Sequence, residues 1–184
     1  MALERLEFAA VTAERWPDLV RLFESRGGPN YCWCMVWREM PAADRSSRPA
    51  KRAELESRVQ GGVPVGILGY VDGEPVAWCS VAPREALRAR ALGGGEYEAG
   101  TRVWSVVCFF ASRVVRGQGI GRRLLEAACA EAAEQGAEVI EGYPVDPDSP
   151  SDRFMGFRSM FLDAGFEEVG RAGTRRQVMR RFVR

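Results

Sequence analysis

Residues 114–123, Val-Val-Arg-Gly-Gln-Gly-Ile-Gly-Arg-Arg, join a strand-like run to a helix-like run through three closely spaced glycines. The run 102–110 before them is rich in β-branched and aromatic residues, whereas apolar residues recur at helical spacing from Ile120 to Ala132. A helix therefore begins inside a glycine loop, where its first amide hydrogens have no acceptor within the helix. Because the helix dipole adds about half a positive charge there, the stretch predicts a phosphate-binding loop.

Residues that the stretch lacks argue against two known kinds of phosphate-binding loop. A Walker-type loop needs a lysine directly after its last glycine, and the one lysine of the chain is Lys51. A dinucleotide-binding loop needs G-x-G-x-x-G, but these glycines are spaced G-x-G-x-G and Arg122 stands in the sixth position. Glu141 does fall near the place of a ribose-binding acid, but too few elements follow it for a Rossmann half. A turn that merely starts a helix is the remaining alternative.

Two motifs resemble the GNAT superfamily of N-acyltransferases. Arg116, Gly119 and Gly121 match the acyl-coenzyme A signature R/Q-x-x-G-x-G/A, and residues 161–166 match a second feature, an aromatic residue followed after three residues by Gly-Phe. The order of elements from Leu6 to the C-terminus is also similar to that family. The resemblance implies acetyl-coenzyme A as co-substrate.

The apolar pattern predicts further elements around this loop. Asp72 and Gly73 between two strand-like runs predict a tight hairpin, and residues 91–100 predict a flexible loop. The strand before the glycine loop, its helix and the strand after Gly136 form a β-α-β unit, whose short crossover requires parallel strands. The remaining predicted elements are strands at 6–11, 63–71, 74–81 and 137–142 and helices near 16–23 and 51–59.

These elements predict one domain over residues 1–184. The expected fold class is α/β of the α+β type, and the resemblance implies that its β-α-β unit binds acyl-coenzyme A. The resemblance implies a GNAT-like mixed, mostly antiparallel central sheet of six to seven strands flanked by about four helices.

Composition excludes several classes of protein and site. With 26 Lys and Arg against 25 Asp and Glu, the net charge of +1 gives no field that recruits nucleic acid or a membrane. The chain has no 18-residue apolar run, and Glu4, Arg5 and Glu7 stand where a signal peptide needs an apolar core, so we expect a cytoplasmic protein. Five cysteines are an odd number, and the chain has no histidine. Neither a disulfide framework nor a zinc site is therefore expected, and Cys-His or Ser-His nucleophile pairs are excluded.

The resemblance also implies where the co-substrate binds. The family's fourth and fifth strands splay apart, and the pantetheine arm pairs with strand backbone in the gap, while the diphosphate lies on the amides of the glycine loop. The residues so implied are Phe109, Phe110, Ala111, Arg116, Gly117, Gln118, Gly119, Ile120, Gly121 and Arg122.

The implied chemistry is direct attack of an amine on a thioester in a ternary complex. The amide near Phe109 is the candidate oxyanion donor, and Glu141 is the candidate base, because partial burial would raise its pKa toward neutrality. A surface or salt-bridged glutamate is the alternative. The family's tyrosine acid is replaced by Phe161, and an asparagine earlier in that helix by Phe154. Tyr143 is therefore the candidate acid, and the alternatives are that solvent protonates the thiolate unaided and that Tyr143 is a half-buried edge aromatic.

The acceptor is predicted from aromatic and acidic residues. Tyr31, Trp33 and Trp37 place aromatic faces in the expected pocket wall, and Asp146 gives the loop after the fifth strand negative charge. Together they favour a small cationic amine, a polyamine or an aminoglycoside-like acceptor. The four-residue spacing of Trp33 and Trp37 also fits the core-facing side of a helix. The sequence leaves a homodimer open. The alternatives to an enzyme are a non-catalytic coenzyme A-binding regulatory module and a nucleotide-binding interaction domain.

Overall fold

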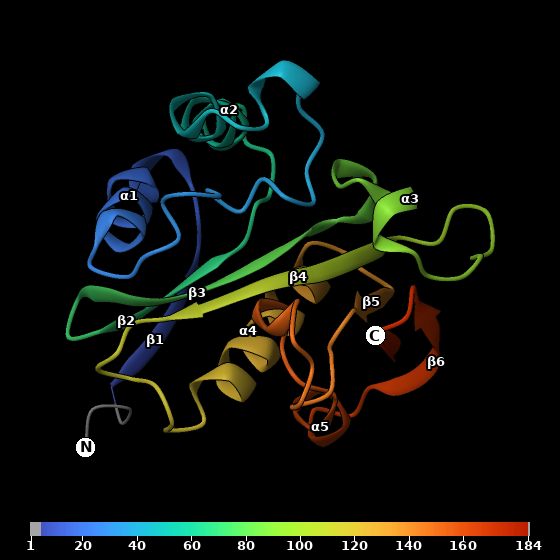
Figure 1. Ribbon diagram of the computed structural model, residues 1–184. Coiled ribbons are helices and arrows are strands. Elements are labelled where there is room, and N and C mark those ends of the chain that lie inside the picture. Colours follow the sequence, from blue (N-terminus) through green and yellow to red (C-terminus); the bar gives the residue numbers. More distant parts are fainter. Residues whose placement is uncertain (1–4, 184) are drawn as a thin grey trace.

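The computed structural model describes residues 5–183, and its centre is a single seven-stranded sheet with the strand order β1-β2-β3-β4-β5-β7-β6 (Figure 1). The strands are β1 (Leu6–Ala10), β2 (Ile67–Val71), β3 (Glu74–Pro83), β4 (Val103–Ala111), β5 (Val139–Gly142), β6 (Glu167–Ala172) and β7 (Arg176–Phe182). Only the pair β4 and β5 is parallel among these neighbours. The predicted mixed, mostly antiparallel sheet with its β-α-β unit is confirmed.

Helices cover both faces of this sheet. The α-helices of the described chain are α1 (Trp16–Glu24), α2 (Arg48–Gln60), α3 (Ala89–Leu92), α4 (Ile120–Glu134) and α5 (Arg158–Asp163). Figure 1 shows α1 and α2 over one face and α4 with α5 over the other. The single turn α3 lies where the sequence predicts the start of a loop. Within residues 5–183, no helix is long and apolar enough to cross a bilayer.

The core forms on the sides of the helices that the sequence pattern indicates. Ile120, Leu124 and Ala128 of α4 are buried against the sheet, as helical periodicity requires. On the opposite face, Leu19 and Phe23 of α1 are fully buried with Trp78 of β3 and Leu55 of α2. Each face of the sheet therefore has its own apolar cluster.

The hairpin β2–β3 turns where the sequence predicts it. Asp72 and Gly73 both have positive φ angles, 50° and 80°, which is the backbone of the tight turn that favours Asp-Gly. Val71 and Glu74 close the ladder on either side of the turn. The hairpin places β3 beside β4, the strand on which the candidate site is built.

Candidate functional site

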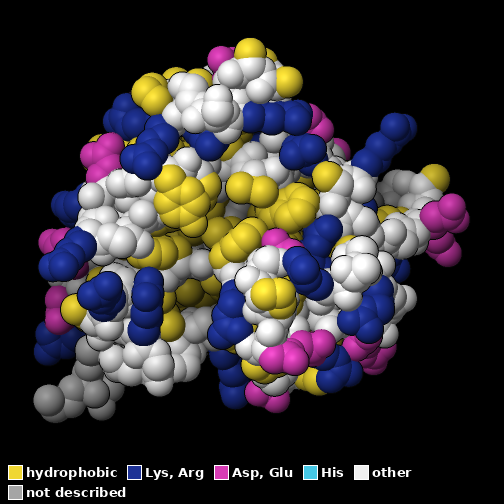
Figure 2. Space-filling model, in the orientation of Figure 1, with side chains coloured by type: hydrophobic (Ala, Val, Ile, Leu, Met, Phe, Trp, Pro, Cys, Tyr) yellow, Lys and Arg dark blue, Asp and Glu magenta, His cyan; other side chains and the backbone are white. Residues whose placement is uncertain are grey.

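A cleft forms where β4 extends beyond its parallel neighbour. The pairing of β4 with β5 ends at Val106 and Gly142, whereas β4 continues to Ala111. An apolar cleft of about 150 Å³ lies along this free part of β4. It is lined by Pro29, Tyr31, Cys32, Cys34, Val36, Trp37, Val107, Cys108, Phe109, Phe110 and Phe154. Figure 2 shows apolar side chains gathered in this hollowed part of the surface.

A bulge in β4 positions the residues that line the cleft. Ser80 of β3 pairs with Cys108 and Val81 pairs with Val106, so Val107 is an extra residue in β4. Such a bulge interrupts the ladder and changes the direction of the side chains that follow. Val106 belongs to the apolar cluster under α4. Cys108 belongs to the cluster of Trp78 on the opposite face, and Val107 belongs to a third cluster, with Tyr143. The predicted oxyanion donor, the amide near Phe109, follows this bulge directly.

The glycine loop precedes α4 as the sequence predicts, and it is open to the outside. Gly117 and Gly119 have φ angles of 76° and 75°, and among residues 5–183 nothing lies within 4 Å of a Cβ built on either. The Nε of Arg116 donates to the backbone carbonyl of Ala111 at 2.7 Å, and the side-chain amide of Gln118 donates to the backbone carbonyl of Val114 at 3.0 Å. The side chain of Arg116 therefore holds the loop to the end of β4, the side chain of Gln118 bonds within the loop, and the space above the two glycines is free.

Gly121, the last glycine of the motif, serves packing between helices. A Cβ at this position would lie 2.9 Å from the sulfur of Met160 in α5. The neighbouring Arg122 pairs with Glu126 one turn along α4 at 3.0 Å, with both side chains exposed. Gly117 and Gly119 are therefore the glycines that leave room for a phosphate group.

Residues 30–37, between α1 and α2, form turns, so the helical alternative for Trp33 and Trp37 is wrong. Trp33 and Cys34 have left-handed backbone angles, with φ of 47° and 50°. Trp33 is buried among Trp16 and Phe23, away from the cleft, whereas Trp37 lines the cleft. The predicted pair of aromatic residues is therefore divided between the core and the cleft.

A buried arginine holds this segment to the sheet. Arg38 is only 2% exposed, and its guanidinium donates to the carbonyls of Cys34 and Val65 and to the hydroxyl of Ser80. Sequence reasoning missed Arg38 because nothing in its neighbourhood distinguishes it from a surface arginine.

Of the other predicted acceptor-binding residues, Tyr31 lines the cleft and Asp146 does not. The carboxylate of Asp146 accepts a hydrogen bond at 2.9 Å from the amide of Gln177 in β7. A cation already lies on Trp37, because the guanidinium carbon of Arg176 is 4.6 Å from the ring centroid. Arg176 also donates to the carbonyls of Ala91 and Leu92 at the end of α3.

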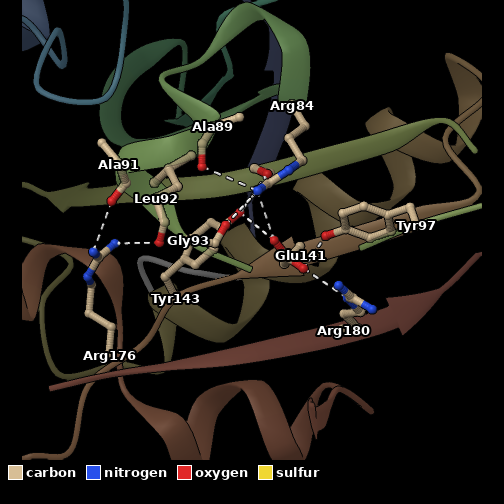
Figure 3. A network of polar contacts seen from close by, with 11 residues as sticks. Arg84, Ala89, Ala91, Leu92, Gly93, Tyr97, Glu141, Tyr143, Arg176 and Arg180 are labelled. Carbon is tan, nitrogen blue, oxygen red and sulfur yellow. Dashed lines mark hydrogen bonds and ion pairs between the residues drawn. The ribbon is translucent and has the colours of Figure 1, made fainter. Parts of the chain in front are cut away.

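The carboxylate of Glu141 is fully buried in a cluster of four donors (Figure 3). Arg84 at 3.0 Å and the hydroxyl of Tyr143 at 2.6 Å donate to Oε1, and Arg180 at 2.8 Å and the hydroxyl of Tyr97 donate to Oε2. Two oxygens of an ionised carboxylate offer about four lone-pair sites, so these donors occupy all of them. The salt-bridged alternative describes this geometry, although burial is complete. Glu141 does not line the cleft.

Tyr143 is also fully buried, unlike the half-buried edge aromatic of the alternative interpretation. Its hydroxyl lies 3.1 Å from the hydroxyl of Ser105 and contacts Arg84 and Glu141. Desolvation by burial, with the nearby charge of Glu141, raises the pKa of Tyr143 well above its ordinary value. The structure therefore brings the two predicted acid–base residues together, but places them beside the cleft wall.

Three of the four partners of Glu141, namely Arg84, Tyr97 and Arg180, were not found from the sequence. Arg180 lies in a C-terminal run of arginines, and a run of charged residues usually marks a solvated face. Its pairing with Glu141 depends on the register of β5 against β7, in which these two residues are directly opposite. Tyr97 reaches the cluster from the loop after α3, and a Cβ on Gly94 would meet Glu141 Oε1 at 2.4 Å.

Phe161 and Phe154 occupy different places. Phe161 is fully buried between Phe109 and Phe166, and a Cβ on Gly142 would lie 2.1 Å from its ring. Phe154 is 38% exposed and forms part of the cleft wall. The ring of Phe161 therefore packs against Gly142 at the end of β5, and Phe154 adds apolar surface to the cleft.

Buried thiols predict a loss of stability in alkali. The side chains of Cys34 and Cys79 are buried, and their pKa values are raised well above the ordinary value of 9.0, for Cys34 chiefly by its hydrogen bond with Cys108 and for Cys79 by desolvation. Above about pH 9 the unfolded chain releases protons that the native state retains. The free energy of unfolding should therefore fall by about 1.4 kcal/mol per pH unit for each such thiol.

Urea unfolding between about pH 8 and pH 10.5 measures this slope. Cys79→Ala should make this slope shallower by the contribution of one thiol, about 1.4 kcal/mol per pH unit. A free energy of unfolding that stays constant across this range would contradict the prediction.

The chain matches a known family model and shares its fold with solved structures. The model of the family described as Acetyltransferase (GNAT) family matches residues 29–157. No curated protein matches the chain in sequence.

Solved structures share the fold at low identity. A ribosomal-protein-alanine N-acetyltransferase from Brucella melitensis is 19% identical, with a TM-score of 0.57 and coverage of 96% of this chain and 99% of that one. A putative acetyltransferase from Salmonella typhimurium, solved with its cofactor acetyl-CoA, is 14% identical, with a TM-score of 0.57 and coverage of 98% and 95%. The PaiA N-acetyltransferase from Thermoplasma acidophilum, in complex with coenzyme A, is 12% identical, with a TM-score of 0.57 and coverage of 97% and 99%.

Proposed function

Because the chain belongs to the GNAT acetyltransferase family, we propose that it transfers an acetyl group from acetyl-coenzyme A to a primary amine by direct attack. The observation that carries this proposal is the arrangement of two features along β4. The glycine loop follows the end of the strand, and the apolar cleft lies beside the bulge at Val107. A thioester between the two features would face an acceptor in the cleft.

The residues present fit the co-substrate. Open space above Gly117 and Gly119 leaves room for a diphosphate on the loop amides, and Arg116 adds positive charge beside them. The edge of β4 that β5 leaves unpaired beyond Val106 offers backbone for the pantetheine arm, at Phe109, Phe110 and Ala111, while the side chains of Phe109 and Phe110 line the cleft. Acetyl-coenzyme A supplies the activated acetyl group.

The reaction forms a bond between the amine nitrogen and the carbonyl carbon and breaks the carbon–sulfur bond. The amide near Phe109 is the proposed donor to the oxyanion, and a fixed donor of this kind contributes about 2.7–4 kcal/mol in known oxyanion holes. The amine loses a proton and the departing thiolate gains one. Glu141 as base and Tyr143 as acid stay predictions.

The four donors on Glu141 argue for a positioning role instead. To take a proton from the amine, the carboxylate would have to release one of its partners. A fully buried Tyr143 likewise has no path to the thiolate without movement. An amine attacks only in its neutral form, so without rearrangement of this cluster the amine loses its proton to solvent and not to Glu141.

We expect Gly119→Asp to raise the KM for acetyl-coenzyme A at least about tenfold, because its carboxylate would lie beside the diphosphate. The readout is release of free thiol from acetyl-coenzyme A with a panel of primary amines. Gly173→Asp is the matched control, since Gly173 has a φ of 70° and open space around its Cβ position, but lies between β6 and β7.

The outcomes separate enzyme from binding module. Amine-dependent thiol release, with a KM for acetyl-coenzyme A that is raised at least about tenfold in Gly119→Asp but not in the control, supports the transferase and the loop assignment. Thermal stabilisation by acetyl-coenzyme A without thiol release from any amine supports the regulatory module instead. If acetyl-coenzyme A neither stabilises the protein nor is consumed, the proposed function is wrong.

A further inference from the structure

We infer that the acceptor is a small primary amine with one uncharged, ring-sized apolar group, which lies in the cleft along β4. This inference rests on the proposed function and narrows its substrate class. It replaces the cationic acceptor that the sequence favours, because Trp33 and Asp146 lie outside the cleft.

The walls of the cleft carry no charge. Of the residues that the structure describes, those lining the cleft are aliphatic, aromatic or thiol-bearing. The hydrogen bond with Cys34 and burial raise the pKa of the Cys32 thiol, and the hydrogen bond with Cys108 raises that of Cys34, so both thiols are neutral at pH 7. A charged group placed in such surroundings would lose its hydration without gaining a partner.

The size of the cleft suits a single ring. Its volume is about 150 Å³, and an apolar cavity of about that volume is known to hold benzene. A larger polyamine or an aminoglycoside would leave most of its polar groups outside. The exposed side chains of Tyr31, Val36 and Phe154 extend the apolar surface to the mouth of the cleft.

Three positively charged side chains from outside the cleft contact residues that line it. Arg176 lies over the ring of Trp37, the aromatic face on which a cationic acceptor would rest. The ammonium of Lys51 donates to the backbone carbonyl of Tyr31 at 3.2 Å, and Arg38 donates to that of Cys34. A second ammonium on the acceptor would therefore meet like charges, whereas a neutral ring would not.

The first experiment compares kcat/KM for 2-phenylethylamine, ethylamine and 1,4-diaminobutane, with acetyl-coenzyme A at saturation. We expect 2-phenylethylamine to exceed both other amines at least about tenfold, since the apolar contacts of a ring distinguish substrates by that much or more. A kcat/KM for 1,4-diaminobutane equal to or above that of 2-phenylethylamine would overturn the inference.

A pair of variants tests whether the cleft is responsible. Val36→Asp adds a carboxylate at the mouth of the cleft, and the ratio of kcat/KM values should shift about tenfold or more toward the diamine. Val169→Asp is the matched control, because Val36 is 47% exposed and Val169 is 49% exposed, but Val169 lies on β6 away from the cleft. Equal shifts in both variants would overturn the assignment.

An acyl-length series and a binding measurement complete the test. If hexanoyl-coenzyme A outperforms acetyl-coenzyme A and the amine's apolar group has no effect, the cleft holds the acyl chain and the inference fails. If no amine releases thiol, the proposed function fails, and thermal shifts with coenzyme A and each amine still decide the inference. Stabilisation by 2-phenylethylamine that Val36→Asp abolishes supports it, and equal or greater stabilisation by 1,4-diaminobutane contradicts it.

Discussion

Glu141→Gln is expected to lower the free energy of unfolding by about 3–5 kcal/mol, as removal of one partner from a buried charge cluster does. The carboxylate is fully buried and is the shared acceptor of Arg84 and Arg180, whose side chains are each only 16% exposed. A neutral amide in its place leaves two guanidinium groups without a counter-charge in a region of low dielectric. The hydroxyl groups of Tyr97 and Tyr143 would also lose a charged acceptor.

Urea unfolding of the parent and the variant measures this loss. Glu126→Gln is the matched control, because Glu126 pairs with Arg122 at 3.0 Å on α4 with both side chains exposed, and the change should cost less than about 0.5 kcal/mol. A destabilisation of Glu141→Gln no greater than that of the control would show that the cluster contributes little to stability.

The same variant distinguishes a positioning role from a base. At a temperature where Glu141→Gln stays folded, a positioning residue predicts that the pH profile of kcat keeps its shape while the loop around Gly94 and Tyr97 becomes more accessible to protease. A base predicts that the acidic limb of the pH profile disappears and kcat falls.

Arg38→Ala should destabilise the protein by about 3 kcal/mol or more, because each buried acceptor left without a partner costs about 1–3 kcal/mol. Its guanidinium donates to the carbonyls of Cys34 and Val65 and to the hydroxyl of Ser80, all buried contacts. Desolvation lowers the pKa of Arg38 to about 10, so the side chain is still charged at neutral pH. The variant also frees the turns that form one wall of the cleft.

Two further variants make this prediction specific. Arg38→Met keeps most of the buried volume but removes the donors and the charge, so in urea unfolding it should lose most of the stability that Arg38→Ala loses. Arg45→Ala removes an exposed arginine whose nearest carboxylate, on Glu39, is 3.9 Å away, and should change stability by less than about 0.5 kcal/mol. If Arg38→Met were as stable as the parent, the hydrogen bonds of Arg38 would not hold this segment.

Local patterns predicted the parts of the fold that neighbouring residues specify. The glycines before α4, its apolar spacing and the Asp-Gly turn of β2–β3 each depend on residues within one element or one turn. The segment with Trp33 and Trp37 shows where such a pattern fails. Their helical spacing is coincidental, since left-handed angles at Trp33 and Cys34 break any helix and the bonds of Arg38 hold the turns in place.

The sequence by itself determined the glycine loop, the helix that follows it and the β-α-β unit, because turn geometry and the spacing of buried side chains depend on residues that are close together in the sequence. The tertiary structure alone decided the environment of Glu141 and the walls of the cleft. Glu141 and Arg180 are 39 residues apart and meet only through the register of β5 against β7. The cleft likewise needs the bulge at Val107, the turns at 31–37 and Phe154 in one place, and only long-range packing brings them together.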